Sequence, residues 1–179
     1  MRRLLCGLGL LWLLAACSHP MPPEPVPLSR GASFELMPPA SYGADLAVQH
    51  QVTLIQADQE RQWVVLLEIE GDQLAMAALG PMGQPLLSLT WGPEGLSEQS
   101  PLPLPVEGRF VLADLQLALW PHLSGLKGLH LEESATERRF FSAQKELIRI
   151  TYYPQRVGFK WLQIQHFERN YRLKITALD

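Results

Sequence analysis

Residues 61–79 read Arg61-Gln-Trp-Val-Val-Leu-Leu-Glu-Ile-Glu70, then Gly71-Asp72, then Gln73-Leu-Ala-Met-Ala-Ala-Leu79, and they carry the clearest secondary-structure signal in the chain. Its first ten residues are rich in β-branched and aromatic side chains, which favour strands. Its apolar residues recur at the two-residue period of a strand: Trp63, Val65, Leu67 and Ile69. Because glycine accepts the positive φ angle of a tight turn, Gly71-Asp72 predicts a β-hairpin.

Further strands are predicted on both sides of this hairpin. Residues 46–54 alternate between apolar and polar side chains, and residues 86–91 are predicted to form another strand, which ends at Gly92-Pro93. Strand-like runs return closer to the C-terminus, at residues 128–132, 138–142, 146–153, 160–168 and 171–178. The sequence therefore predicts two groups of strands with a different segment between them.

The segment between these groups has helical spacing. Apolar residues recur at the 3.6-residue period over residues 110–120, namely Val111, Leu112, Leu115, Leu119 and Trp120. A proline-rich loop at residues 101–105 precedes this helix, and Pro121 ends it.

The order of strands, one helix and strands lacks the alternation of a parallel nucleotide-binding sheet. We expect a mainly β (α+β) fold, in which an open, strongly curved antiparallel sheet forms a half-barrel covered by a short helix. One face of this sheet is apolar and would lie against the helix. Such a cup has either a hollow or a filled interior, and sequence periodicity does not distinguish the two.

The N-terminal residues have the pattern of a secretory signal. Residues 1–3 carry two arginines and residues 4–16 are mostly apolar, a run too short for the ~20 residues that span a bilayer. Leu14-Ala15-Ala16-Cys17 resembles the lipobox of bacterial lipoproteins. We expect residues 1–16 to be a signal peptide and Cys17 to be lipidated. The alternative is an ordinary signal peptide cut after the two alanines. Ser18, where inner-membrane lipoproteins carry Asp, implies delivery to the periplasmic face of the outer membrane.

Residues 17–30 are expected to tether the anchor to a single domain of residues 31–179. Five prolines lie in this stretch: Pro20, Pro22, Pro23, Pro25 and Pro27. It is either an extended polyproline segment, at ~3.1 Å per residue, or a disordered one. The acyl chains would bind the membrane, since each buried methylene contributes ~0.8 kcal/mol.

The composition excludes several classes of function. The chain has 47% hydrophobic and 18% charged residues, as folded globular proteins do. Its net charge of −3 falls to near −5 once Arg2 and Arg3 leave with the leader, which argues against nucleic-acid binding. Cys6 would leave too, so Cys17 stands alone. An internal disulfide and a metal site built on several thiolates are therefore excluded, and we expect no metal or cofactor.

No catalytic signature stands out in the sequence. It lacks a Gly-x-Ser-x-Gly elbow, a His-Glu-x-x-His pair and a phosphate-cradling glycine loop. We therefore do not expect an enzyme, and a hydrolase acting on an acyl product is the least favoured alternative.

Several motifs resemble a family of bacterial lipoproteins of unassigned function found near aryl-polyene biosynthesis genes. These are Leu36-Met-Pro-Pro-Ala-Ser-Tyr-Gly43, the strand from Val48, Ala113-Asp-Leu-Gln-Leu-Ala-Leu-Trp-Pro121, and Asn170-Tyr-Arg-Leu-Lys-Ile175. That family is similar to the lipoprotein carrier LolA and receptor LolB, which share a half-closed β-barrel with a helical lid. The resemblance implies a lipid or a lipoprotein's acyl chain as ligand, and the lipoprotein-sorting machinery as partner.

Gly80-Pro81-Met82-Gly83 is predicted to form the turn after residue 79. In the LolB receptor, a hairpin reading Asn-Pro-Leu-Gly occupies the matching place, and its protruding leucine helps to pass lipoproteins to the membrane. The resemblance implies that Met82 is a membrane-contact residue. The alternative is a hairpin tip that packs locally.

The candidate ligand-cavity residues come from the apolar face of the sheet and from the helix: Val48, His50, Val52, Leu54, Trp63, Val65, Leu67, Leu89, Trp91, Leu115, Leu119 and Trp120. His50 would either orient a ligand head group or be a hydrogen-bonded wall residue. The tryptophans suit cavity walls and packed cores equally. Two hypotheses follow: a LolB-like cup that binds or transfers an apolar molecule, or a structural lipoprotein with a filled core and a protein partner.

Overall fold

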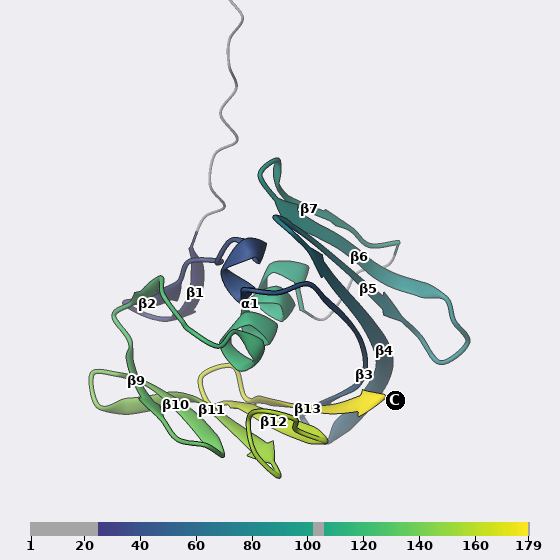
Figure 1. Ribbon diagram of the computed structural model, residues 1–179. Helices are drawn as coiled ribbons and strands as arrows, with labels where there is room; N and C mark the ends of the chain where they lie inside the picture. Colours follow the sequence, from purple (N-terminus) through teal and green to yellow (C-terminus); the bar gives the residue numbers. More distant parts are fainter. Residues whose placement is uncertain (1–24, 102–105, 179) are drawn as a thin grey trace, which may run out of the picture.

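The computed structural model describes residues 25–101 and 106–178, and it is built on one curved antiparallel sheet (Figure 1). One part of this sheet consists of β3 (Leu46–Gln56), β4 (Gln59–Glu70), β5 (Gln73–Leu79), β6 (Pro85–Gly92) and β7 (Gly95–Gln99). The other part consists of β9 (His130–Glu133), β10 (Glu137–Ser142), β11 (Lys145–Tyr153), β12 (Trp161–His166) and β13 (Tyr171–Leu178). The ten strands lie in the order β7-β6-β5-β4-β3-β13-β12-β11-β10-β9. The pairing of β13 with β3 thus joins the two parts.

The remaining elements lie beside and within this sheet. A smaller sheet has the order β1-β2-β8, with β1 at Val26–Ser29, β2 at Ala32–Phe34 and β8 at Leu126–Lys127. A 3-10 helix, η1 (Pro39–Tyr42), precedes β3, and α1 (Gly108–Leu119) connects β7 to β8.

The large sheet curls into a half-barrel with α1 in its hollow (Figure 1). It stays open because its end strands, β7 and β9, do not pair with each other. The predicted fold class is therefore confirmed: a mainly β fold with an open, curved antiparallel sheet and a short helix. The predicted hairpin over residues 61–79 is β4–β5, and Gly71 has a φ angle of +56° in its turn.

α1 is buried on every side and not only along one apolar stripe. Residues 112–118 are buried without a break, as in a helix enclosed by the rest of a fold. Leu112, Leu115 and Leu117 share one core with the inner face of the large sheet, and Val26 and Phe34 of the small sheet belong to the same core. The helix is thus packed between both sheets, whereas the sequence predicted contact with one.

Two buried polar side chains hold α1 in place. Gln116 Oε1 accepts a hydrogen bond from the Met37 backbone N–H at 2.8 Å, and Gln116 Nε2 donates one to the Met37 carbonyl at 2.9 Å. Arg138 on β10 is fully buried; it donates to the Leu117 carbonyl at 2.8 Å and pairs with Glu133 at 2.6 Å. Because the last carbonyls of a helix have no partner within it, Arg138 caps the C-terminal end of α1.

The packed structure begins before Gly31, the predicted start of the domain. Val26 and Leu28 of β1 lie in the stretch expected to be a tether, yet both are buried. β1 pairs with β2 and turns alternate residues inward, and Pro27 is tolerated because β1 is an edge strand. The signal peptide, Cys17 and the first residues of the tether lie outside the described residues, so those assignments stay predictions.

Candidate functional site

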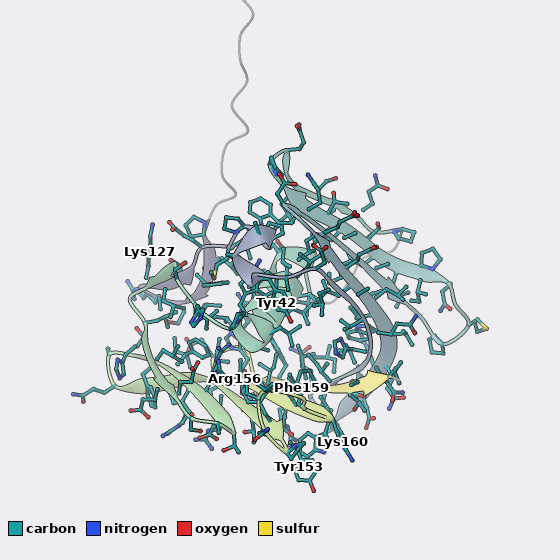
Figure 2. The ribbon with its side chains drawn as sticks, viewed as in Figure 1. Tyr42, Lys127, Tyr153, Arg156, Phe159 and Lys160 are labelled. Atoms are coloured by element: carbon teal, nitrogen blue, oxygen red, sulfur yellow. The ribbon has the colours of Figure 1, made fainter. Side chains whose placement is uncertain are left out.

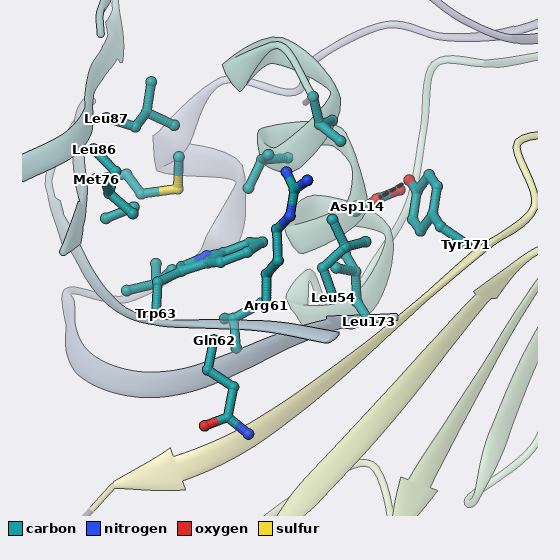
Figure 3. Close-up of a pocket in the computed structure, with 15 residues that line it drawn as sticks. Leu54, Arg61, Gln62, Trp63, Met76, Leu86, Leu87, Asp114, Tyr171 and Leu173 are labelled. Atoms are coloured by element: carbon teal, nitrogen blue, oxygen red, sulfur yellow. Dashed lines mark hydrogen bonds between the residues drawn. The ribbon is translucent and has the colours of Figure 1, made fainter. Parts of the chain in front are cut away.

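A cavity of about 260 Å³ lies inside the half-barrel, between the sheet and α1 (Figure 3). Most of its lining is apolar and comes from β3, β4, β5, β6, β13 and α1, including Val52, Leu54, Trp63, Val65, Met76 and Ala78. The lining uses the start of β4 and the end of β5. The cavity therefore lies at the end of the sheet that carries the β3–β4 and β5–β6 turns. We call it the cup cavity.

Strand alternation explains why the lining is apolar and why space remains. Trp63 is opposite Val52, and Val65 is opposite Ala78, all on the inner face of the sheet. The inner face of β5 carries the larger Met76 and then Ala78 towards its end. The short side chain of Ala78 leaves part of the cup unfilled.

A buried acid and a buried phenol lie on the helix side of the cup cavity. The Tyr171 hydroxyl donates a hydrogen bond to Asp114 Oδ2 (Figure 3), and both side chains are buried. Burial raises the pKa of Asp114 to about 7, although the Tyr171 hydrogen bond and the charge of Arg169 act in the opposite direction. Burial, together with the charge of Asp114, raises the pKa of Tyr171. Tyr171 therefore stays protonated, and Asp114 changes its charge near neutral pH.

One cationic side chain, Arg61, also lines the cup cavity. Arg61 lies near the start of β4 and is exposed. Figure 3 shows its side chain reaching from the strand across the cavity towards α1. The site thus combines apolar walls, a cation at its open side and an acid that is partly neutral at pH 7.

The predicted cavity residues separate into three groups. Val52, Leu54, Trp63 and Val65 line the cup cavity together. Five others are buried in the core and do not line the cup cavity: Leu67, Leu89, Trp91, Leu115 and Trp120. Much of the cup interior is therefore filled by α1 and its neighbours, and the hollow is restricted to one end.

The third group, Val48, His50 and Leu119, lines a second cavity of about 460 Å³. Tyr42 of η1, Arg156 and Phe159 also line this cavity, and Figure 2 shows Arg156 and Phe159 below α1. The His50 ring stacks on Phe159 with 5.9 Å between centroids, and burial lowers the pKa of His50. Its Nδ1 is buried without a hydrogen-bond partner among the described residues. A role for His50 in orienting a ligand stays a prediction.

A broader hollow of about 740 Å³ runs along β3–β6. It touches some predicted residues, such as Leu67 and Leu89, but its lining also includes exposed side chains such as Gln49, Glu68 and Thr90. Because water reaches these polar groups, this hollow is less suited to an apolar ligand than the cup cavity.

Met82 lies at the tip of the β5–β6 hairpin and is 90% exposed. Hydrogen bonds of the turn itself hold the tip: the Met82 N–H donates to Gln84 Oε1 at 3.0 Å, and the Gly83 N–H donates to the Gly80 carbonyl at 2.8 Å. The Met82 side chain therefore does not pack on the fold. It projects from the end of the sheet that holds the cup cavity, and membrane contact stays a prediction.

Four residues of the cup cavity were not predicted from the sequence: Arg61, Ala78, Asp114 and Tyr171. Two of them carried a signal in the sequence. Arg61 is in phase with Trp63 and Val65 on the inner face of β4, and Asp114 is an acid inside an otherwise apolar helix. Such an acid is expensive to bury without a partner, so it marks a site. The partner Tyr171, 57 residues away, is evident only in the structure.

Three further observations concern the described residues only. Among the described residues, no serine, cysteine or histidine lines the cup cavity. No group of three or more His, Cys, Asp or Glu side chains within residues 25–101 and 106–178 is arranged to hold a metal ion. In the same ranges, no helix has the length and apolar character needed to cross a bilayer.

Comparisons with known proteins place the chain in a family without assigning its activity. A search of curated proteins finds no match. A family model described as "Protein of unknown function (DUF3261)" matches residues 47–179. The match spans β3 to β13 together with α1, so it includes the walls of the cup cavity and leaves out β1, β2 and η1. The chain therefore belongs to the DUF3261 family of proteins of unknown function.

Proposed function

We propose that this protein binds one acyl chain, or a similarly slender apolar molecule, in the cup cavity. The apolar hollow of about 260 Å³ between the sheet and α1 carries this proposal. Its volume lies just below the ~300–1,000 Å³ of sites for drug-sized ligands, which suits a single chain. Apolar area removed from water would stabilise the complex by ~25 cal/mol per Å².

The membrane anchor predicted from the sequence is part of this proposal. An acylated Cys17 would hold the protein on the periplasmic face of the outer membrane, where it would bind or transfer a lipid as a LolB-like cup. The projecting side chain of Met82, at the same end as the cup cavity, supports this arrangement. Acyl chains of lipoproteins and polyene-type molecules are the ligands that the sequence resemblance suggests, with the lipoprotein-sorting machinery as partner. Catalysis is not part of the proposal.

A second candidate function is that of a structural lipoprotein with a protein partner. The burial of Leu67, Leu89, Leu115 and Trp120 favours it, because these residues belong to the packed core and do not line the cup cavity. In that case the cup cavity would be a packing defect, and crosslinking in cells would recover one dominant protein partner and no lipid.

A substitution that fills the cup cavity distinguishes lipid binding from a purely structural role. Ala78→Phe places a ring in the cavity, whereas Ala77→Phe places the same ring on the opposite, outer face of β5. Both variants would be purified from residue 17 onwards with Cys17→Ser, so that no anchor is attached, and their bound lipids would be extracted for mass spectrometry. Acyl compounds should accompany the parent protein and Ala77→Phe but not Ala78→Phe.

Ala78→Phe also risks overpacking, which costs about 1–3 kcal/mol. The smaller Ala78→Leu and a thermal melt of each variant separate loss of ligand from loss of fold. A parent protein that carries no lipid and binds no fluorescent fatty acid would contradict the proposal. Full retention of ligand by a folded Ala78→Phe would contradict it too.

A further inference from the structure

Arg61 is a cation that faces the interior of the cup cavity. It is opposite Leu54 across β3 and β4, on the strand phase whose side chains point into the cup. In Figure 3 its side chain extends across the cavity towards α1, with Trp63 on one side and Leu54 on the other. Its guanidinium therefore faces the space that a ligand would occupy.

Arg61 has no carboxylate partner within residues 25–101 and 106–178. It donates one hydrogen bond, at 3.3 Å, to the side-chain oxygen of Gln59, and it takes part in none of the ion pairs of the described chain. By contrast, Arg138 and Arg139 lie 2.6 and 3.0 Å from a glutamate oxygen. Since a guanidinium has five N–H donors, most of the donors of Arg61 are free for a ligand.

The acid that lines the cup cavity does not neutralise Arg61. Asp114 accepts its hydrogen bond from Tyr171, and the cation that acts on its charge is Arg169. No ion pair joins Asp114 to Arg61. The cavity therefore presents an apolar wall together with an uncompensated positive charge.

We propose that the ligand of the cup cavity is a single-chain carboxylate of the fatty-acid class, with its carboxylate bound by Arg61 and its tail between the sheet and α1. This inference rests on the proposed function and names the chemical class of its ligand. A guanidinium donates two parallel hydrogen bonds to a planar carboxylate. One guanidinium matches one negative charge, and about 260 Å³ favours one chain over the two of a phospholipid.

Isothermal titration with three ligands of equal chain length tests the inference. Decanoate, decanol and decylamine share a tail and differ in the charge of the head. The parent protein, from residue 17 with Cys17→Ser, should bind decanoate most tightly and decylamine least. Arg61→Gln should weaken decanoate binding about tenfold and leave decanol binding unchanged. Arg61→Glu should reverse the order and favour decylamine.

Arg172→Gln is the matched control, because Arg172 is exposed and lies opposite Ile55, on the outer face of β13. It should leave all three affinities unchanged. Equal binding of decanoate and decanol by the parent protein, or unchanged decanoate binding by Arg61→Gln, overturns the inference while the proposed function stands. Failure of the parent protein to bind any of the three ligands overturns the proposed function itself.

Discussion

Replacing Asp114 with Asn tests how the buried acid of the cup cavity links stability to pH. The replacement keeps the shape of the side chain, and the Asn Oδ1 can still accept the hydrogen bond of Tyr171. Burial raises the pKa of Asp114 from its ordinary value of 3.8 to about 7. One pKa unit corresponds to 1.36 kcal/mol, so ionising this side chain in the folded protein opposes folding by about 4 kcal/mol.

The sign of the effect follows from where the proton is held. Between pH 4 and 7 the folded protein keeps a proton on Asp114 that the unfolded chain has released. The stabilisation that comes from holding this proton on Asp114 is therefore complete below pH 4, and it is lost as pH rises through 7. Burial also lowers the pKa of His166 to about 4, which makes stability rise with pH between about 4 and 6.5. The contribution of His166 is the same in the parent protein and in Asp114→Asn, so it cancels when their free energies of unfolding are subtracted.

Urea unfolding at half-unit steps from pH 4.5 to 8.5 measures this difference. We expect Asp114→Asn and the parent protein to be similar near pH 4.5, and the variant to be more stable by about 3–4 kcal/mol at pH 8. Asp72→Asn, in the exposed β4–β5 turn, is the control and should follow the parent protein throughout. A difference between Asp114→Asn and the parent protein that is flat across this range, or that grows towards low pH, would refute the reasoning.

Two other predictions concern the hairpin tip and the helix cap. Met82→Glu should reduce sedimentation of the protein with phosphatidylglycerol vesicles several-fold because a charge replaces an exposed apolar side chain; Met82→Leu is the control, and equal sedimentation of both variants would exclude membrane contact. Arg138→Met should lower the free energy of unfolding by about 2–3 kcal/mol, since it leaves the buried Leu117 carbonyl of α1 without its donor and leaves Glu133 with Arg156 alone. Arg139→Met removes partly exposed ion pairs with Glu132 and Glu146 and should cost about 1 kcal/mol; similar losses for the two arginines would contradict the capping role.

Elements with a local signal could be predicted from the amino-acid sequence. The two-residue period of residues 61–70 and the turn at Gly71 predicted the β4–β5 hairpin, because a half-buried strand shows which face is inside. The period change at residues 110–120 predicted α1 nearly to the residue. β1 was missed because four residues with a proline resemble a tether, and only pairing with β2 makes them a strand. The assignments of residues 1–16 as a signal peptide and of Cys17 as a lipidation site rest on the sequence alone and stay predictions.

Which parts of the cup are filled, and which residues meet there, depends on how distant segments pack and could not be predicted from the sequence. Leu54, Asp114 and Tyr171 lie far apart in the chain, and they converge because β13 pairs with β3 while α1 lies against both. Leu67 and Leu89 have the same strand phase as Leu54, yet they belong to the buried core that includes α1, whereas Leu54 lines the cup cavity. Periodicity specifies the face of a side chain but not what lies opposite it, and the opposing surface determines whether that face is a core or a binding site.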